Sequence, residues 1–303
     1  MQITHLKHHQ IDKERWDYAI ENSTNPLIYA LSWFMDIFSP NWEALILGNY
    51  EFIMPLTWRK KIIFKYLYQP MFIQQLGIFS AKEVKKDIQK EFIKKLKNKY
   101  KLIDIQLNYA NPALDSEHFI LRNTQLIDLS IPYTELYRKY KKNHRKNLKK
   151  IYETELMIDR KGECSDFVDL TRKMFAAKAV DEITDHDIVK LEKVVNQSLK
   201  LKIGEFYFGH LNGEICAAAY FLKWKKRVIV YTALNDTGRE VGAMFGLIDK
   251  YLKENAGKDL LFDFAGSNIP GVKYRNLGFG ARNEVYYRVT ITNLPIPFKW
   301  FKK

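Results

Sequence analysis

Cysteine is scarce in this chain of 303 residues, which contains only Cys164 and Cys216. Neither belongs to a CxxC pair, and no cluster combines Cys and His at the spacing of zinc ligands, so we expect no metal site. An isolated cysteine packs as a small apolar residue far more often than it acts as a nucleophile. The sequence therefore argues against zinc-dependent and cysteine-dependent chemistry.

Long apolar segments are also lacking. The N-terminal stretch MQITHLKHHQ has no apolar core of a signal peptide, and no stretch approaches 18 apolar residues. Hydrophobic residues make up 47% and charged residues 28% of the chain, which is typical of a globular protein. We expect a soluble, cytoplasmic protein with two domains of ordinary size, residues 1–130 and 131–303, although no internal sequence repeat is visible.

The net charge of +14 is concentrated in two segments. Residues 82–101 contain nine lysines and three acidic residues, and residues 131–161 contain ten Lys or Arg and four acidic residues, so each segment carries +6. Charge of one sign raises the local potential and attracts anions. Candidate partners are tRNA, a nucleotide-linked substrate, CoA and the anionic membrane surface, but no specific DNA site is indicated.

Both segments have helical periodicity. In residues 81–101 the apolar residues recur at every fourth position, which predicts an amphipathic helix whose lysines form a solvated face. The run YKKNHRKNLKK, residues 140–150, lies within a similar pattern of Leu136, Tyr140, His144 and Leu148. We therefore expect this run on a helix that is anchored on one side, rather than on a free nucleic-acid-binding arm.

The order of the expected elements indicates the fold. The second half predicts helices at 163–179 and 184–200, strands at 203–211, 214–224 and 227–235, a helix at 239–254, a strand at 258–264, a short helix and a strand at 283–291. This order is typical of a GNAT N-acyltransferase domain. The first half repeats it less clearly, with a hairpin turn at Gly48-Asn49. We predict an α/β (α+β) protein of tandem GNAT-like domains, each a mixed, mostly antiparallel sheet flanked by helices.

Three stretches resemble the Fem-type (FemABX) family. They are TQLIDLSIPYTELYRKYKKNHRKNLKKIYE, FDFAGSNIPGVKYRNLGFG, the most specific of the three, and IYALSWFMDIF. Fem-type proteins and the related BioF2-like acyltransferases consist of tandem GNAT-like domains and transfer an acyl or aminoacyl group to an amine. Members that branch peptidoglycan use aminoacyl-tRNA and a UDP-linked muropeptide.

The resemblance assigns four substrate-site residues. Tyr274 and Arg275 stand where the family commonly has Phe-Lys, so Arg275 is expected to stabilise an oxyanion or a phosphate. Arg145 matches the family's arginine in the basic segment, and Trp33 matches the tryptophan of the early helix. The muropeptide-binding members carry a lysine just after that tryptophan, whereas here the sequence continues Phe-Met-Asp-Ile, which weakens the case for a muropeptide acceptor.

Acyl transfer to an amine also needs a base and a proton donor. Asp263, on a strongly apolar strand, is the candidate base, and a structural carboxylate that binds the following turn is the alternative. Tyr231 is the candidate proton donor or, alternatively, a core tyrosine. Ser267 and Gln75 are candidate substrate-binding residues, although Gln75 also fits a simple amide at a strand end.

The stretch TGREVGAMFG bears on CoA binding. GNAT enzymes hold the CoA pyrophosphate with Q/R-x-x-G-x-G/A at a helix start. Arg239 and Gly242 fit this pattern and Met244 does not, so an ordinary helix start is an equal interpretation. The tail at 293–303 mixes aromatic and basic residues, which suits either a membrane interface or packing on the first domain.

Two functions follow. The first is an N-acyltransferase or aminoacyltransferase without a tightly bound cofactor, which uses acyl-CoA or aminoacyl-tRNA as donor. Its acceptor is an amine on a small molecule or peptide, with a cell-envelope precursor as one candidate. The second is a non-catalytic protein of the same fold that binds RNA or an anionic surface.

Overall fold

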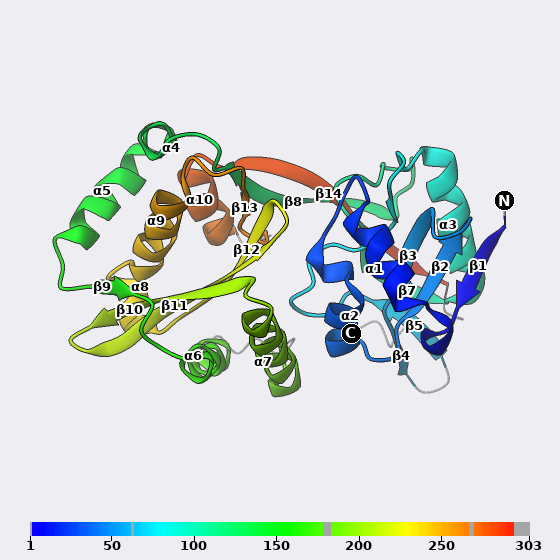
Figure 1. Cartoon of the computed structure of the whole chain (residues 1–303), viewed down its shortest axis with the longest axis horizontal. Coiled ribbons are helices and arrows are strands. Elements are labelled where there is room, and N and C mark those ends of the chain that lie inside the picture. Colours follow the sequence, from blue (N-terminus) through cyan, green and yellow to red (C-terminus); the bar gives the residue numbers. More distant parts are fainter. Residues whose placement is uncertain (1, 62–63, 178–182, 267–269, 294–303) are drawn as a thin grey trace. The chain divides into compact units, whose positions relative to one another are not determined.

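The computed structural model describes residues 2–61, 64–177, 183–266 and 270–293 (Figure 1). Contacts divide the chain into two compact units: unit 1 consists of Met1–Arg122 and Val285–Lys303, and unit 2 of Asn123–Glu284. The sequence predicts a boundary between 130 and 131. The two divisions differ mainly at the last strand, most of which belongs to unit 1 by its contacts.

Unit 1 contains two sets of strands. In the order β1-β2-β3-β6, all neighbours pair antiparallel, and in the order β4-β5-β7-β14, β5 and β7 pair parallel. The elements are η1 (His8–Gln10), α1 (Lys13–Glu21), η2 (Ile28–Ala30), α2 (Ser32–Phe38), α3 (Lys86–Lys99), β1 (Ile3–Leu6), β2 (Glu43–Leu47), β3 (Phe52–Leu56), β4 (Trp58–Lys61), β5 (Phe64–Tyr68), β6 (Phe79–Ser80), β7 (Leu102–Gln106) and β14 (Arg282–Thr292).

The predicted hairpin and lysine-rich helix of unit 1 are confirmed. β2 and β3 pair with Leu47 opposite Phe52, and Gly48 adopts φ 68° in the connecting turn. On α3, Phe92, Ile93 and Leu96 are buried in the core beside Val289 and Ile291 of β14, while the lysines of the helix lie outside it. The spacing of the apolar residues in α3 therefore determines which face of the helix packs against the core of unit 1.

Unit 2 has the strand order β8-β13-β12-β11-β10-β9, in which all neighbours are antiparallel except the parallel pair β12 and β13. The elements are β8 (Phe119–Asp128), α4 (Tyr133–Lys139), α5 (Lys142–Tyr152), β9 (Met157–Asp159), α6 (Cys164–Ala177), α7 (Asp185–Lys200), β10 (Gly204–Leu211), β11 (Glu214–Trp224), β12 (Arg227–Leu234), α8 (Asp236–Glu240), α9 (Ala243–Asn255), β13 (Leu261–Asp263) and α10 (Pro270–Gly278).

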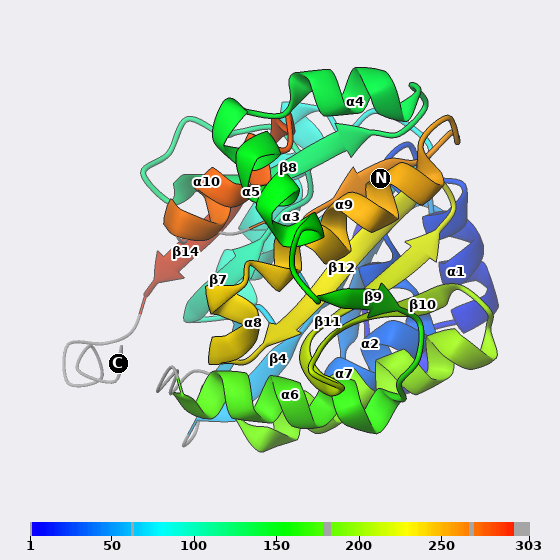
Figure 2. The same cartoon turned by 90° about the vertical axis from the view of Figure 1, so that its left-hand side faces the viewer.

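The two faces of the unit 2 sheet have different roles. One face presents Val228, Val230 and Phe262 to a core that includes α9, and α5 packs beside α9 (Figure 2). The opposite face carries Tyr220 and packs against α6 and α7. Side chains alternate between the faces because successive residues of a strand point in opposite directions.

Two expected helices are interrupted. The basic segment forms α4 and α5 rather than one helix, because Tyr140 and Lys141 adopt extended backbone angles. The helix expected at 239–254 is likewise split into α8 and α9, with Gly242 left-handed at φ 70°. The apolar periods that predicted these helices continue across both breaks, so the pattern alone could not locate them.

Candidate functional site

The late motif and the basic segment, far apart in the chain, are in contact. The Lys141 N–H donates to the carbonyl of Gly278 at 2.9 Å, and His144 Nε2 lies 2.8 Å from the carbonyl oxygen of Arg275. The Lys141 ammonium also lies 4.9 Å from the centre of the exposed Tyr274 ring. Two of the three stretches that resemble the Fem family therefore form one structural feature, in which the α4–α5 connection holds α10.

Arg275 is a half-buried cation without an acidic partner in the part of the chain that is described. Its Nε and one terminal nitrogen donate to Asn276 Oδ1 at 3.2 and 3.1 Å, and no described carboxylate lies within ion-pair distance. Burial lowers the pKa of the Arg275 guanidinium to about 10. An uncompensated, partly desolvated guanidinium favours an oxyanion or phosphate as a bound partner.

Asn276 continues the polar chain behind Arg275. Its amide donates to Gln125 Oε1 at 3.2 Å, and the Gln125 amide donates to Asn283 Oδ1 at 3.3 Å. All three amides lie in unit 2, and Asn276 and Gln125 are fully buried. This chain limits the movement of the α10 backbone beside Arg275.

Asp263 is buried at the end of β13, and its carboxylate is already paired. Oδ2 accepts a 2.9 Å bond from Arg227, while Oδ1 accepts the Thr124 hydroxyl and, at 2.9 Å, the N–H of Ala265. These contacts account for Asp263 as a structural carboxylate that also fixes the left-handed Ala265. Its role as base stays a prediction, and one of these bonds would have to open for Asp263 to accept a proton from an amine.

Tyr231 lies on β12 opposite Tyr220, and burial raises the pKa of its hydroxyl. The phenol therefore keeps its proton at neutral pH, as both a proton donor and a core tyrosine would. Ser267, the remaining candidate of this motif, lies outside the described residues.

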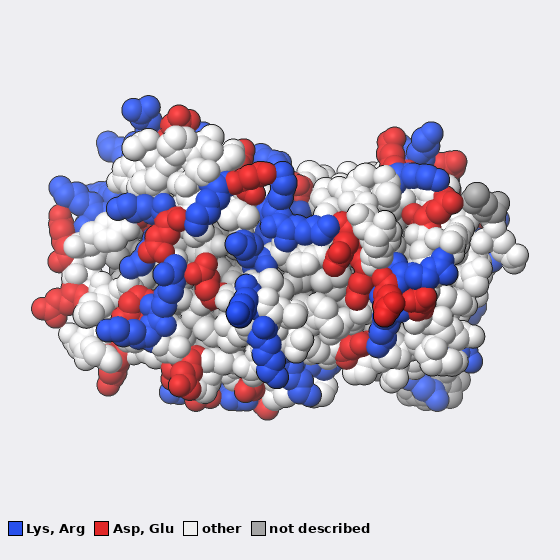
Figure 3. Space-filling model, in the orientation of Figure 1, with Lys and Arg blue, Asp and Glu red and all other residues white. Residues whose placement is uncertain are grey.

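Helix α5 presents a cationic surface. An open depression there is lined by four cations, Lys142, Arg145, Lys146 and Lys149, together with Tyr137, Asn143, Tyr152 and Glu153. None of the four cations forms an ion pair with a described residue. Lys and Arg side chains appear along the left and upper-left margin of Figure 3, where Figure 1 places α4 and α5. Arg145, which the resemblance assigned to substrate binding, lies on this surface.

The sequence predicted the apolar stripe that anchors α5, but it did not reveal a second, polar contact of this helix. Asp249 of α9 is fully buried and accepts bonds from the hydroxyls of Tyr133, at 2.8 and 3.0 Å, and Tyr152, at 2.5 Å. The two tyrosines precede Asp249 by 116 and 97 residues. The signal available in the sequence was Asp249 itself, an acidic residue on the apolar face of a predicted helix. A buried carboxylate needs a hydrogen-bond donor, so its position indicated that a donor lies nearby.

The expected CoA pyrophosphate site differs from the usual pattern. Arg239 lies on α8 and pairs with Asp236 at 2.6 Å, so its charge is partly compensated. A Cβ on Gly242 would lie 3.3 Å from Ile151 of α5, so α5 approaches the start of α9 closely. Met244 is buried, and at this position the CoA-binding pattern has a small residue.

The two candidates in unit 1 have ordinary packing environments. Trp33 on α2 is half-buried against Phe34, with ring centres 5.2 Å apart. Gln75 is fully buried, accepts a 2.9 Å bond from the Tyr109 N–H and donates to Gln74 Oε1 at 3.1 Å. These bonds occupy both ends of the Gln75 amide, and its role in substrate binding stays a prediction.

Solved structures share this fold. FemX aligns over 100% of both chains with a TM-score of 0.64 at 12% identity. A GNAT-family acetyltransferase from Colwellia psychrerythraea aligns over 96% of this chain and 100% of its own, with a TM-score of 0.54 at 12% identity. The C-terminal domain of a putative lysylphosphatidylglycerol synthetase from Agrobacterium fabrum aligns over 92% and 91%, with a TM-score of 0.54 at 13% identity.

No protein-family model and no curated protein matches the sequence. The structural similarities confirm the predicted fold class, a mixed α/β GNAT fold of the kind found in FemX. Within the described residues, no helix combines the length and apolar character needed to cross a membrane.

Proposed function

We propose that the protein is a Fem-type transferase that moves an aminoacyl group from aminoacyl-tRNA to an amine. The observation that carries the proposal is Arg275, a half-buried cation with no described acidic partner, held in place by α5, the helix that presents the cationic surface. This arrangement offers one isolated charge for the reacting group and a wider cationic surface for a polyanion. The FemX-like fold supports the same assignment.

In this reaction the amine nitrogen attacks the ester carbonyl. The C–N bond forms, the bond to the ribose oxygen breaks, and one proton passes from the nitrogen to the leaving oxygen. Arg275 stabilises the negative charge that develops on the carbonyl oxygen, or binds the adjacent phosphate, because it donates hydrogen bonds while keeping its charge. Lys142, Arg145, Lys146 and Lys149 bind the phosphate backbone of the donor.

Acyl-CoA is the second candidate donor, and two observations favour aminoacyl-tRNA over it. Arg239 is already paired with Asp236, and Met244 occupies the small-residue position of the pyrophosphate pattern. The α5 surface, by contrast, carries four cations without a described acidic partner. The acceptor is an amine of a small molecule, a peptide or a cell-envelope precursor.

The test measures transfer from radiolabelled aminoacyl-tRNAs, and in parallel from acetyl-CoA, to pooled small-molecule, peptide and lipid acceptors. We expect transfer from aminoacyl-tRNA, and we expect Arg275→Gln to reduce kcat by roughly 100-fold, the range for a lost oxyanion donor. Arg282→Gln, which removes an exposed arginine of the same unit, is the control and should change little.

Three outcomes of this test would contradict parts of the proposal. Transfer from acetyl-CoA alone would reject the tRNA donor. Salt-sensitive RNA binding without any transfer would favour the non-catalytic RNA-binding function. Full activity of Arg275→Gln would remove Arg275 from the site.

A further inference from the structure

His144 lies inside the contact between α5 and α10. Its side chain is buried, and the ring packs edge-on against Phe245 and Phe279 with centres 5.0 and 5.1 Å apart. Nε2 lies 2.8 Å from the carbonyl oxygen of Arg275. Because a carbonyl can only accept, Nε2 carries the hydrogen and donates it.

The backbone of α10 is shaped to receive this ring. A Cβ on Gly278 would lie 1.8 Å from His144 Cε1, so glycine is required for the ring to reach the last turn of the helix. Two residues on, Gly280 is left-handed at φ 77°, and a Cβ there would lie 2.6 Å from Lys139 Cβ. Both glycines of the Gly-Phe-Gly sequence thus allow the α4–α5 connection to approach α10.

The charge state of His144 fits a hydrogen-bonding role. Burial lowers the pKa of the imidazole, and the neighbouring charges of Lys141 and Arg275 lower it further. The hydrogen bond to the Arg275 carbonyl raises the pKa but does not outweigh these effects. The ring is therefore neutral at pH 7. Nδ1 is buried without a hydrogen-bond partner among the described residues, so the ring has one directional bond, the one to Arg275.

We propose that His144 is a positioning residue that fixes Arg275 relative to the cationic surface of α5. The inference rests on the proposed function, in which Arg275 acts on the reacting group and α5 binds the donor. His144 acts through the main chain of Arg275: its ring sets the distance between α5 and α10, and its N–H fixes the rotation of α10. A donor bound on α5 is then presented to the Arg275 guanidinium in a defined register.

Two classes of variant separate hydrogen bonding from packing. His144→Gln keeps an N–H donor at about the position of Nε2, whereas His144→Leu keeps apolar volume without a donor. His144→Asn carries a donor too short to reach the carbonyl and replaces the leucine variant if that variant does not fold. Leu148→Ala is the matched control, because Leu148 is buried one turn further along α5.

Two measurements are made on the full chain: kcat and KM for the donor, and the rate at which phenylglyoxal modifies Arg275, followed by mass spectrometry. We expect His144→Leu to lower kcat by about 10- to 100-fold at unchanged KM, as for a misplaced catalytic group. We also expect faster modification of Arg275. In His144→Gln, kcat and the modification rate of Arg275 should be close to their wild-type values. Leu148→Ala should change neither kcat nor the modification rate.

Wild-type values for His144→Leu in both measurements would overturn the proposal, as would equal effects of His144→Leu and Leu148→Ala. Failure of the glutamine variant to recover either property would also overturn it. If the wild-type chain transfers no aminoacyl group, the proposed function fails, and the modification rate alone decides whether His144 positions Arg275.

Discussion

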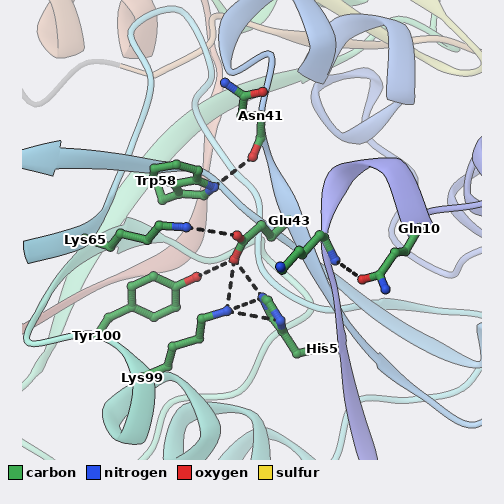
Figure 4. A network of polar contacts seen from close by, with 9 residues as sticks. His5, Gln10, Asn41, Glu43, Trp58, Lys65, Lys99 and Tyr100 are labelled. Atoms are coloured by element: carbon green, nitrogen blue, oxygen red, sulfur yellow. Dashed lines mark hydrogen bonds and ion pairs between the residues drawn. The ribbon is translucent and has the colours of Figure 1, made fainter.

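The charges of Glu43, which is buried, and of Arg275, which is half-buried, have opposite surroundings. Glu43 of β2 accepts bonds from Lys99 at 3.0 Å, from His5 at 2.7 Å and, through its other oxygen, from Lys65 at 3.3 Å (Figure 4). Tyr100 adds a fourth bond, at 3.1 Å. Removal of one partner from a compensated buried charge is destabilising, whereas an uncompensated charge such as that of Arg275 lowers stability until a ligand binds.

Replacing Glu43 with Gln should destabilise unit 1. Burial acts to raise the pKa of Glu43, but the bonds from His5 and Lys99 outweigh it and hold the pKa well below the usual 4.5. We expect a loss of roughly 1.5 to 3 kcal/mol at pH 7, the range for hydrogen bonds to a charged group. Urea titrations of the wild-type protein and of Glu43→Gln measure this difference in the free energy of unfolding.

The pH dependence follows from the lowered pKa. Stability from Glu43 is present above the unfolded-state pKa near 4.5 and is lost as pH falls through the folded-state value, so the two proteins should converge in acid. Glu51→Gln is the control, because Glu51 pairs with the exposed Lys82 at 2.7 Å and such pairs contribute about 0–1 kcal/mol. A difference that stays constant from pH 7 to pH 3 would contradict this account.

Prediction at the residue level was limited by the distance between partners along the chain. Arg275 was found through the resemblance of its motif, and His144 through the apolar period of α5. The hydrogen bond between them joins residues 131 positions apart, and Tyr133 and Asp249 are 116 apart. Local sequence patterns carry no information on such pairs. The same limit explains why the pairing of Asp263 with Arg227 was not foreseen.

Variants of the two basic helices, α3 and α5, can show whether RNA binding depends on net charge or on the position of the charges. Both carry exposed lysines around a buried apolar stripe, but only α5 holds α10. Replacing Lys142, Arg145, Lys146 and Lys149 with Gln should weaken RNA binding and make it less sensitive to salt. The logarithmic salt slope should fall by up to ~0.7–0.9 for each phosphate that the protein no longer neutralises.

The control replaces four exposed lysines of α3 with Gln: Lys86, Lys90, Lys94 and Lys97. We expect little change in RNA affinity, because α3 is interpreted as a solvated helix face. Filter-binding titrations at several salt concentrations measure both sets. Equal losses from the two helices would show that net charge, rather than the α5 surface, determines binding.

Element types were predictable because hydrophobic period and turn residues are local properties. The break between α4 and α5 was not predictable, because the Lys141 N–H donates to the carbonyl of Gly278 in α10, a distant element, instead of to a carbonyl of its own helix. The break before α9 had a local signal in Gly242. Glycine in a helix interior is only mildly unfavourable, however, so the signal was insufficient.

At the scale of the whole molecule, the two divisions of the chain predict different behaviour for a fragment of residues 1–130. Such a fragment lacks β14, which pairs with β7 from Arg288 to Thr292 and buries Val289 and Ile291 in the core of unit 1. We expect residues 1–130 alone to unfold without cooperativity. Residues 1–130 joined through a flexible linker to residues 282–303 should unfold cooperatively.

Urea unfolding followed by circular dichroism distinguishes the two fragments. If residues 1–130 alone unfold in one sharp transition at the same midpoint as the linked fragment, the boundary between 130 and 131 is correct. The fold class itself was predictable because the order of helices and strands indicates the layer architecture. The return of the last strand to the first unit was not, because strand pairing is non-local.

The position of β14 has a consequence for synthesis on the ribosome. Residues 1–122 emerge from the ribosome before β14, the strand that pairs with β7. Unit 2 can therefore complete its sheet while the apolar surface that awaits Val289 and Ile291 is still uncovered. Unit 1 therefore stays incomplete until β14 has emerged, and during that interval its uncovered apolar surface is available to a chaperone.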